Sequence, residues 1–339
     1  MYCNLYCKEI SNSMTKTNLT ESAESNFIDY LVCQLGKEYL GDDCAVIDNN
    51  YLITSDSQVE GCHFSLDYFK LYEVGRRLVL INVSDIASMA GIPKYIQIIL
   101  NIPKVFDQYS IKQVYKGIID TCAEYKITIT GGNTTSSQHD LALSATLLGL
   151  KHDLGVCQRF NYKNGYDVVV TGASGLSYTG LKHLENGCRD LTLASVSRHL
   201  NPVPRLDEAI TMLEITKNNL AMIDTSDSVY ESILHLYKIS ELGFNINPDL
   251  LPISPETINL SGNLGINPQA VALFGGEDFE LLVCLPADLY IDINKAFKMH
   301  GYPVQLTKIG QVINNKEVNF NNLNDLGKFK DKILYKHLQ

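Results

Sequence analysis

Acidic side chains recur where apolar, strand-like runs of this 339-residue chain give way to polar residues. In the stretch YLITSDSQVEGCHF, the strand-like residues 51–54 lead to Asp56, and His63 follows before the chain turns apolar again. Further acids follow other runs: Asp42 and Asp43 in GDDCAVID, Asp85 in NVSD, Asp224 and Asp227 in IDTSDS, and Glu277, Asp278 and Glu280 in GGEDFE. Several carboxylates from different segments are what Mg²⁺ needs when it is shared with substrate phosphates. One acid at one strand end would instead be an ordinary solvent-facing residue.

The elements that must position these acids alternate between strands and helices. Strand-like runs (CAVID, YLIT, YIQIILNIP, ITIT, LALSATLLGL) surround helices expected over 78–90 and 111–125, which predicts an α/β or α+β first half. In the first of these helices, Val79, Val83, Ile86 and Ala90 have the spacing of a buried stripe. Asp85 lies about 120° from that stripe and can therefore face a cleft.

The second half opens with YDVVVTGASGLSYTGL, which reads as a strand, a glycine turn and a helix. DTSDSVYESILHLYKISELG predicts a capped helix with Val229, Ile233 and Leu236 inward and Gly243 at its C-terminal stop. We therefore expect an N-terminal domain over 26–150 and a C-terminal domain over 151–339. Residues 1–25 are expected to be a disordered extension, and Met14 offers a second possible start.

Bulk composition restricts the class of protein. With 45% hydrophobic and 19% charged residues the chain is globular, and its net charge of -10 disfavours nucleic acid or an anionic membrane as a partner. Nine cysteines without a C-x-x-C pair indicate reduced thiols and a cytoplasmic protein. No apolar run approaches the length of a membrane span, and the first residues lack the pattern of a signal peptide.

Known phosphate-binding loops do not decide the function. The chain has no G-x-x-x-x-G-K-[ST] loop, and the glycines of GASGLSYTG are not spaced as G-x-G-x-x-G. That turn is as well explained by packing as by phosphate binding. The residues alone thus favour an acid-rich α/β protein, with a magnesium and nucleotide enzyme as one interpretation.

Nine segments in order give a more specific resemblance: GDDCAVID, TSDSQVEGCHF, NVSDIASMAGIP, GGNTTSS, VVVTGASGLSYTGL, NPVPR, IDTSDS, GGEDFELL and KIGQV. This series, from about Asn26 to Phe329, resembles the thiamine-monophosphate kinase family. Its superfamily includes aminoimidazole ribonucleotide synthetase and selenophosphate synthetase. The resemblance implies a PurM-like fold of two α/β domains, with an N-terminal ATP-binding domain that forms the interface of a homodimer.

The implied activity is direct, in-line transfer of the γ-phosphoryl group of ATP to thiamine monophosphate, with several Mg²⁺ ions and no covalent intermediate. By position, the metal ligands would be Asp43, Thr54, Ser55, Asp56, Asp85, Asn133, Asp224 and Asp227. Among these, Asp56, Asp85 and Asp224 are the expected catalytic residues. ATP would contact Gly132, Asn133, Arg159 and Ser226, and thiamine monophosphate would contact His63, Glu277 and Phe329.

The chain departs from the family pattern at two places. GGNT replaces the usual GGDT, so Asn133 stands where an aspartate is expected, and an amide oxygen brings no negative charge to a cation. SDS replaces SDG, which places Ser228 where a glycine would allow unusual backbone angles.

Two other functions remain as alternatives. One is another ATP-dependent enzyme of the superfamily, which VEGCHF and GGEDFELL disfavour. The other is a non-catalytic protein that still binds thiamine phosphate or nucleotide, an interpretation that the change at Asn133 favours and the remaining aspartates disfavour. Dimerisation is expected from the resemblance alone.

Overall fold

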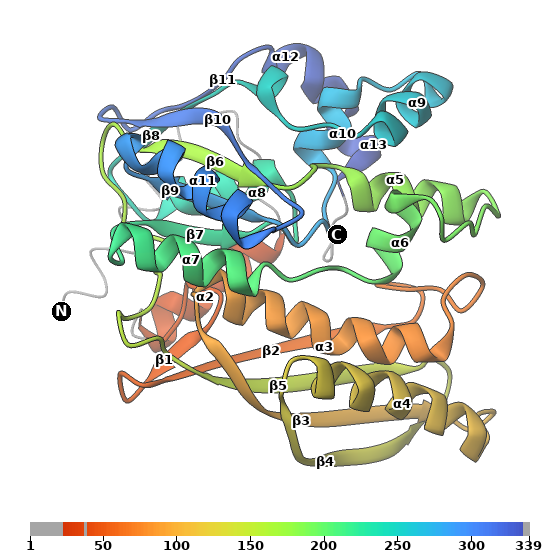
Figure 1. The fold of residues 1–339 in the computed structure, drawn as a ribbon. Helices are drawn as coiled ribbons and strands as arrows, with labels where there is room; N and C mark the ends of the chain where they lie inside the picture. Colours follow the sequence, from red (N-terminus) through yellow and green to blue (C-terminus); the bar gives the residue numbers. More distant parts are fainter. Residues whose placement is uncertain (1–22, 37–38, 335–339) are drawn as a thin grey trace.

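The computed structural model describes residues 23–36 and 39–334 as two β-sheets with helices packed against them (Figure 1). Residues 1–22, most of the predicted N-terminal extension, lie outside the described residues. Helix α2 (Ala23–Leu35) begins inside the predicted extension, so residues 23–25 are helical and not part of a disordered segment.

The first sheet has the strand order β1-β2-β5-β3-β4. Its strands are β1 (Ala45–Ile47), β2 (Tyr51–Val59), β3 (Ile92–Pro103), β4 (Thr128–Ser137) and β5 (Ala142–Leu150). All neighbours are antiparallel except β3 and β4. Helices α3 (Leu71–Ser88) and α4 (Gln108–Glu124) pack on one face. Two strands are longer than predicted, because β2 continues through Asp56 and β4 continues through Asn133.

The second sheet has the order β11-β8-β10-β6-β9-β7. Its strands are β6 (Asp167–Thr171), β7 (Ala221–Asp224), β8 (Gly243–Ile246), β9 (Leu281–Leu285), β10 (Leu306–Ile313) and β11 (Val318–Phe320). The helices of this half are α5 (Leu176–Glu185), α6 (Ala194–Leu200), α7 (Leu206–Thr216), α8 (Val229–Lys238), α9 (Pro255–Leu264), α10 (Pro268–Phe274), α11 (Tyr290–His300), α12 (Leu323–Leu326) and α13 (Lys330–Ile333). Short 3-10 turns lie at η1 (Pro248–Leu250), η2 (Ala287–Leu289) and η3 (Gly327–Phe329).

Both faces of the second sheet are buried, which explains the three consecutive valines in the middle of β6. Val168 and Val170 on β6 pack with α8 and α10, whereas Val169 between them packs with α7 and α11. Alternate residues of a strand point to opposite faces, so a strand covered on both sides has no polar face.

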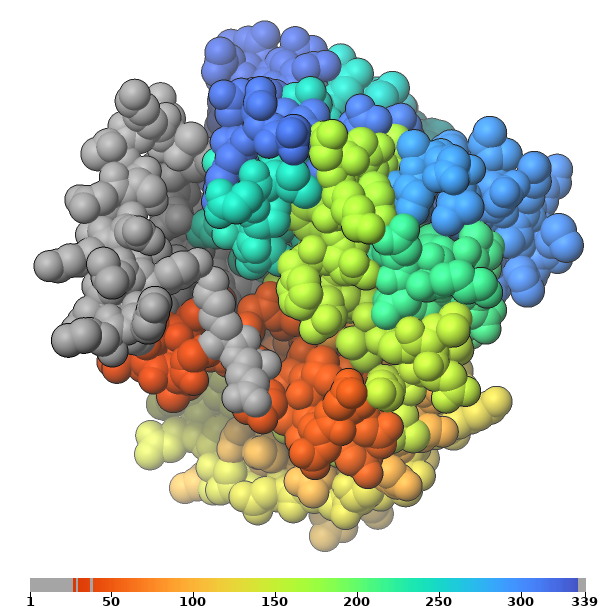
Figure 2. Space-filling view, turned by 90° about the vertical axis from the view of Figure 1, so that its left-hand side faces the viewer, coloured from red at the N-terminus to blue at the C-terminus, as the bar shows by residue number. Residues whose placement is uncertain are grey.

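The two halves meet at helix α3, which lies between the sheets and contacts both α7 and β7 (Figure 1). The predicted stripe of Val79, Val83, Ile86 and Ala90 is buried. Asp85 stays partly exposed in this otherwise buried turn. In Figure 2 the yellow-green segment after β5 lies against the orange N-terminal residues and continues into the upper half.

The other face of the first sheet is open. Along β2, Leu52, Thr54 and Gln58 are buried while Tyr51, Ser55 and Ser57 are exposed. Exposed apolar side chains on this face include Tyr51, Ile92, Tyr95 and Ile99. We call it the open face of the first sheet.

The other bulk properties are straightforward. Seven cysteines lie in the part of the chain that the structure describes, and all are free thiols. Among residues 23–36 and 39–334, no helix combines the length and apolar character needed to cross a bilayer.

Candidate active site

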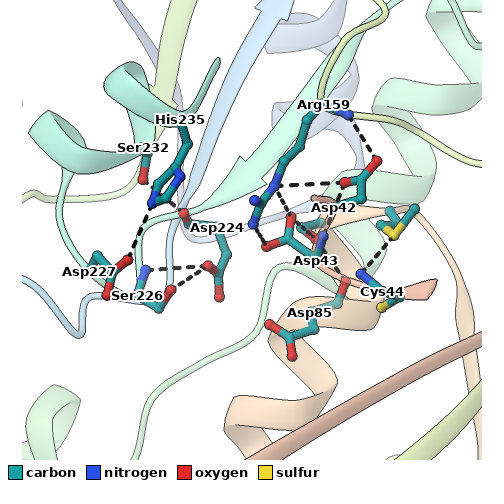
Figure 3. Close-up of polar contacts among 12 residues, drawn as sticks. Asp42, Asp43, Cys44, Asp85, Arg159, Asp224, Ser226, Asp227, Ser232 and His235 are labelled. Carbon is teal, nitrogen blue, oxygen red and sulfur yellow. Dashed lines mark hydrogen bonds and ion pairs between the residues drawn. The ribbon is translucent and has the colours of Figure 1, made fainter. Parts of the chain in front are cut away.

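Three carboxylates meet between the two halves of the molecule. Asp43 precedes β1, Asp85 lies on α3 and Asp224 ends β7, and one oxygen from each lies within 4.8 Å of the others. Figure 3 shows these acids arriving from three separate elements. We call Asp43, Asp85 and Asp224 the acid centre. All its ligand atoms are carboxylate oxygens, the donor type that Mg²⁺ prefers.

Hydroxyl groups orient each carboxylate of the acid centre. Thr54 Oγ1 donates to Asp85 Oδ2 (2.5 Å), and Ser88 Oγ to Asp43 Oδ2 (2.7 Å). Ser84 Oγ donates to Asp224 Oδ2 (2.7 Å), and Ser226 Oγ to Asp224 Oδ1 (2.7 Å). Sequence reasoning missed Ser84 and Ser88. Their signal was available, because they lie within one turn of Asp85 on the same helix.

Asp56 and Ser55 point to opposite sides of β2. Asp56 shares a face with Thr54, and its charge contributes to raising the pKa of Asp85, so Asp56 lies on the acid-centre side. Ser55 Oγ instead pairs with Thr146 Oγ1 (2.8 Å) on the open face. The strand therefore brings Asp56 to the acid centre and turns the Ser55 side chain away from it.

Arg159 balances part of the charge. Its guanidinium pairs with Asp43, its Nε lies 3.7 Å from Asp42 Oδ1, and its backbone N–H donates to Asp42 Oδ2 (3.3 Å) (Figure 3). Although burial opposes it, the charges of Asp43 and Asp42 raise the pKa of Arg159 above its ordinary value. Asp42 was not among the predicted site residues and is the fifth acid at this end, after Asp43, Asp56, Asp85 and Asp224.

The carboxylates of this region lie close together although their negative charges repel one another. Burial, followed by the charges of Asp56, Asp224 and Asp43, raises the pKa of Asp85 well above its usual value. Burial and Asp43 raise the pKa of Asp224 to about 7, and the same two causes raise that of Asp42 to about 7. A bound cation removes this penalty by neutralising the carboxylates. The acid centre therefore fits a divalent metal.

A second group of polar side chains lies farther along β2 and α3. Glu277 Oε1 accepts from Arg77 Nη2 (2.7 Å), and Glu277 Oε2 lies 3.6 Å from His199 Nδ1. Burial would raise the pKa of Glu277, but the charges of Arg77, His199 and His63 outweigh it and lower that pKa. The backbone N–H of Val59 donates to His63 Nδ1 (3.2 Å). The predicted substrate residues His63 and Glu277 thus belong to one neighbourhood.

The two groups are adjacent. Asp56 and Gln58 are two residues apart on one face of β2, about 7 Å along the strand. Arg77 and Asp85 are about 12 Å apart along α3, since each residue rises 1.5 Å. Where β2 and α3 face each other, the metal-type acids therefore lie toward one end and Glu277 toward the other.

Two loops of the second half close this region. Glu277 N–H donates to the carbonyl oxygen of Ser226 (2.5 Å), and a Cβ on Gly276 would lie 2.1 Å from the carbonyl oxygen of Asp227. Asp227 itself is half exposed, with His235 Nε2 3.7 Å from its Oδ2. Asp227 lies beside the acid centre in Figure 3 and is not one of its three members.

Ser228 does not need the backbone freedom of a glycine. Its φ of 172° is extended, and its side chain accepts from the N–H of Glu231, which caps α8. The predicted stripe of Val229, Ile233 and Leu236 is buried. The predicted stop at Gly243 was wrong, because α8 ends at Lys238 and Gly243 begins β8.

The other two acids of GGEDFE are structural. Asp278 accepts from the N–H groups of Gly175 (2.5 Å) and Ser177 (2.8 Å) at the start of α5. Glu280 pairs with Arg205 and accepts from Thr171 Oγ1 (2.6 Å). Both acids are buried, and neither faces the acid centre.

Three predicted residues lie elsewhere. Gly132 and Asn133 are on the exposed edge strand β4, where Asn133 pairs in register with Ile99 and its Oδ1 accepts from the N–H of Thr134 (3.0 Å). A Cβ on Gly132 would lie 1.7 Å from the carbonyl oxygen of Ile98, which is a packing reason for this glycine. Phe329 packs against the core of the second half, and the next residue, Lys330, stacks on Tyr230 at the start of α8.

The fold and the acid centre together define the class of protein. Residues 41–151, which hold all five strands of the first sheet, match the family described as "AIR synthase related protein, N-terminal domain". The solved structure of the hydrogenase maturation protein HypE from E. coli shares the fold, with a TM-score of 0.67 over 89% of this chain and 95% of that one at 16% identity. The expected PurM-like α/β architecture is confirmed.

Relatives define the family more narrowly. The chain is 32% identical over 277 residues to thiamine-monophosphate kinase of Aquifex aeolicus, covering 80% of this chain and 88% of the relative. It is 30% identical over 282 residues to that of Bacillus subtilis, covering 80% and 84%. The structure titled "AaThiL complexed with AMPPCP and TMP" superposes with a TM-score of 0.78 at 28% identity, over 90% of this chain and 96% of that one. The chain belongs to the thiamine-monophosphate kinase family and is a kinase.

Proposed function

We propose that the protein transfers the γ-phosphoryl group of ATP to thiamine monophosphate, giving thiamine diphosphate and ADP. The observation that carries this proposal is the acid centre, where Asp43, Asp85 and Asp224 converge within 4.8 Å in a chain of this family. The complex of one relative with AMPPCP, an analogue of ATP, and TMP supports the choice of substrates.

The chain's own residues bind and orient the reactants. Asp43, Asp85 and Asp224, with Asp56 beside them, would hold Mg²⁺ through carboxylate oxygens. Bound magnesium would neutralise the phosphates of both substrates and the charge of the transferring group. The hydroxyls of Thr54, Ser84 and Ser88 keep the carboxylates in one geometry, so little reorganisation is required at the moment of transfer.

Arg159 and Ser226 supply phosphate contacts beside the acid centre in this proposal. The planar guanidinium of Arg159 already pairs with carboxylate oxygens, and phosphate oxygens suit the same fork of donors. Ser226 Oγ donates to Asp224, so a nucleotide bound at Ser226 would lie next to the metal ligands.

Beside Gln58 and Arg77, His63 and Glu277 would contact thiamine monophosphate. A contact from Phe329, which lies in η3, stays part of the proposal. Asp227, half exposed between the two ends, would hold a further ion near the acceptor phosphate. The proposed transfer is direct and in-line, without a covalent intermediate, and would require the donor and acceptor phosphates to lie between the acid centre and Glu277.

We also propose a homodimer through the open face of the first sheet. Its exposed Tyr51, Tyr95 and Ile99 resemble an interface surface more than a solvated face. Ser55, Gly132 and Asn133 lie on that face or its edge, so they would reach nucleotide only at such an interface.

Division into domains 26–150 and 151–339 remains part of the proposal, supported by strands of the two sheets lying within 45–150 and 167–320. So does a cytoplasmic location.

The test is product formation. Purified protein, ATP and thiamine monophosphate are incubated over a magnesium series, and thiamine diphosphate is quantified by chromatography. Magnesium-dependent thiamine diphosphate is expected. Binding of ATP or thiamine monophosphate in calorimetry, with no product at any magnesium concentration, would instead support the non-catalytic alternative.

A further inference from the structure

Arg77 is a buried cation that joins three separate elements. Its Nε donates to Gln58 Oε1 on β2 (3.2 Å), its Nη1 to the carbonyl oxygen of His199 on α6 (2.5 Å), and its Nη2 to Glu277 Oε1 (2.7 Å). The Arg77 side chain is fully buried. A guanidinium placed in this way fixes the distance between the first sheet and the loop that carries Glu277.

Aromatic rings hold the guanidinium in place. Its central carbon lies 5.9 Å from the centre of the Phe69 ring and 5.5 Å from that of Phe279. Phe69 belongs to the first half of the chain and Phe279 to the loop that contains Glu277. Contact with both rings restricts rotation of the fork, so its hydrogen bonds keep one direction.

The backbone around Glu277 also needs this support. Glu277 and Phe279 have φ of 63° and 50°, in the left-handed region that residues other than glycine rarely adopt. Such backbone persists where surrounding contacts determine it. Here these contacts are the ion pair with Arg77 and the bond from Glu277 N–H to Ser226.

The Glu277 carboxylate remains partly accessible although Arg77 holds it. Oε1 is taken by Arg77, while Oε2 lies 3.6 Å from His199 Nδ1, and the side chain is 35% exposed. A carboxylate held in this way accepts hydrogen bonds, so its ligand must present a hydrogen-bond donor or a positive charge.

We infer that Arg77 is a positioning residue for the acceptor substrate: it fixes the Glu277 carboxylate so that Oε2 receives a donor or cationic group of that substrate. The inference rests on the proposed function. It adds a residue that sets the affinity for the acceptor substrate and does not change the affinity for ATP.

The test compares Arg77→Met and Arg77→Lys with a matched control, Arg76→Met. Arg76 is the adjacent residue of α3 and also spans the two halves, with Nε donating to Asn201 Oδ1 (2.9 Å) and Nη2 pairing with Glu124 (3.0 Å). These two interactions of Arg76 involve none of the residues that Arg77 contacts, namely Glu277, Gln58 and His199. Arg76→Met therefore reports the general effect of losing a cation that links the halves.

We expect Arg77→Met to raise KM for thiamine monophosphate at least about 10-fold, with KM for ATP and kcat changed less than about 3-fold. Arg77→Lys keeps the charge without the fork and should recover part of the affinity. Arg76→Met should leave both KM values near wild type. Equal increases in both KM values, or an unchanged acceptor KM in a folded Arg77 variant, would overturn the inference.

Arg77→Met removes the guanidinium that Gln58 Oε1 and Glu277 Oε1 accept from, so thermal unfolding and circular dichroism are recorded for every variant. Where the Met variant does not fold, Arg77→Lys decides, alone and combined with Glu277→Gln. Because both changes act through one contact, the double variant should have the acceptor KM of Glu277→Gln alone. Two independent, additive effects would contradict a shared role.

A protein without kinase activity can be distinguished from one in which Arg77 has no positioning role. If wild-type protein makes no thiamine diphosphate, calorimetry of thiamine monophosphate binding to wild type and Arg77→Lys still tests Arg77. Weaker binding in the variant supports the positioning role. Absent binding to wild type, or equal binding to both proteins, removes it.

Discussion

Asp85 is the residue at which burial, charge and proposed chemistry meet. It faces three other acids from a partly exposed position on α3, and these charges together with burial raise its pKa. Sequence reasoning could place Asp85 off the buried stripe because helical periodicity is local. It could not show that Asp43 and Asp224 lie beside it, because both are more than 40 residues away along the chain.

Replacing Asp85 with Asn should remove activity and preserve the fold. The amide keeps the shape of the carboxylate but loses a charged metal ligand, so kcat/KM should fall by at least about 100-fold. Without magnesium, the variant should unfold at a temperature equal to or above wild type, since a repelled charge is gone. Steady-state kinetics and calorimetric unfolding measure the two effects. A near-normal rate would refute the assigned role.

His199 gives a pH dependence with a definite sign. Burial lowers its pKa from 6.5 to about 4, against the charge of Glu277. The unfolded chain therefore takes up the proton first, so this contribution is complete above pH 6.5 and is lost as the pH falls toward 4. A shift of this size corresponds to roughly 3 kcal/mol.

Urea unfolding of wild type and His199→Asn between pH 4 and pH 7 measures this contribution. We expect the stability of the variant to fall less steeply below pH 6.5 than that of wild type. His139→Asn, at an exposed position, serves as the control for the loss of a histidine. Identical slopes in wild type and His199→Asn would show that folding does not lower the pKa of His199.

At the scale of elements, the sequence predicted which segments are strands and helices better than where they end. Propensity and turn residues placed a boundary after Thr54, yet β2 continues to Val59 because β5 pairs with every residue of the strand. Likewise GGNT reads as a turn but forms the edge of the sheet, where β3 supplies the hydrogen bonds. Long-range pairing decides such boundaries, and no local pattern contains it.

Asp278 illustrates an element stabilised from a distance. It lies a hundred residues beyond α5 and still accepts the N–H groups of Gly175 and Ser177. Asp278→Ala should lower the free energy of unfolding by about 2 kcal/mol, since it leaves buried donors unpaired. Asp107→Ala, which removes an exposed local cap from α4, should cost about 1 kcal/mol. Urea denaturation measures both, and an unchanged midpoint for Asp278→Ala would contradict the capping role.

At the scale of the whole molecule, the open face sets the expected assembly. The second sheet is covered on both faces. The first sheet is covered on one face only, and its open face carries the exposed side chains of Tyr51, Tyr95 and Ile99. The sequence indicated a dimer only through its resemblance, because alternation along a strand does not tell solvent from a partner subunit.

Ile99→Lys tests the assembly. The Ile99 side chain is 43% exposed, so a lysine should be tolerated by the folded subunit but not by an apolar interface. Sedimentation should show a dimer for wild type and a monomer for the variant. Met299→Lys, at an apolar position on α11 that is 86% exposed, serves as the control and should stay dimeric. A monomeric wild type would remove the proposed interface.

Phosphoryl transfer itself is measured most directly with ATP labelled on its γ-phosphoryl group. Wild-type protein in excess is mixed with labelled ATP, magnesium and thiamine monophosphate for a single turnover, and Asp85→Asn is treated in parallel. We predict that the label appears in thiamine diphosphate with wild type, in step with ATP loss, and remains in ATP with the variant. Label released only as inorganic phosphate, or retained by ATP in wild type despite bound substrates, would contradict the proposed function.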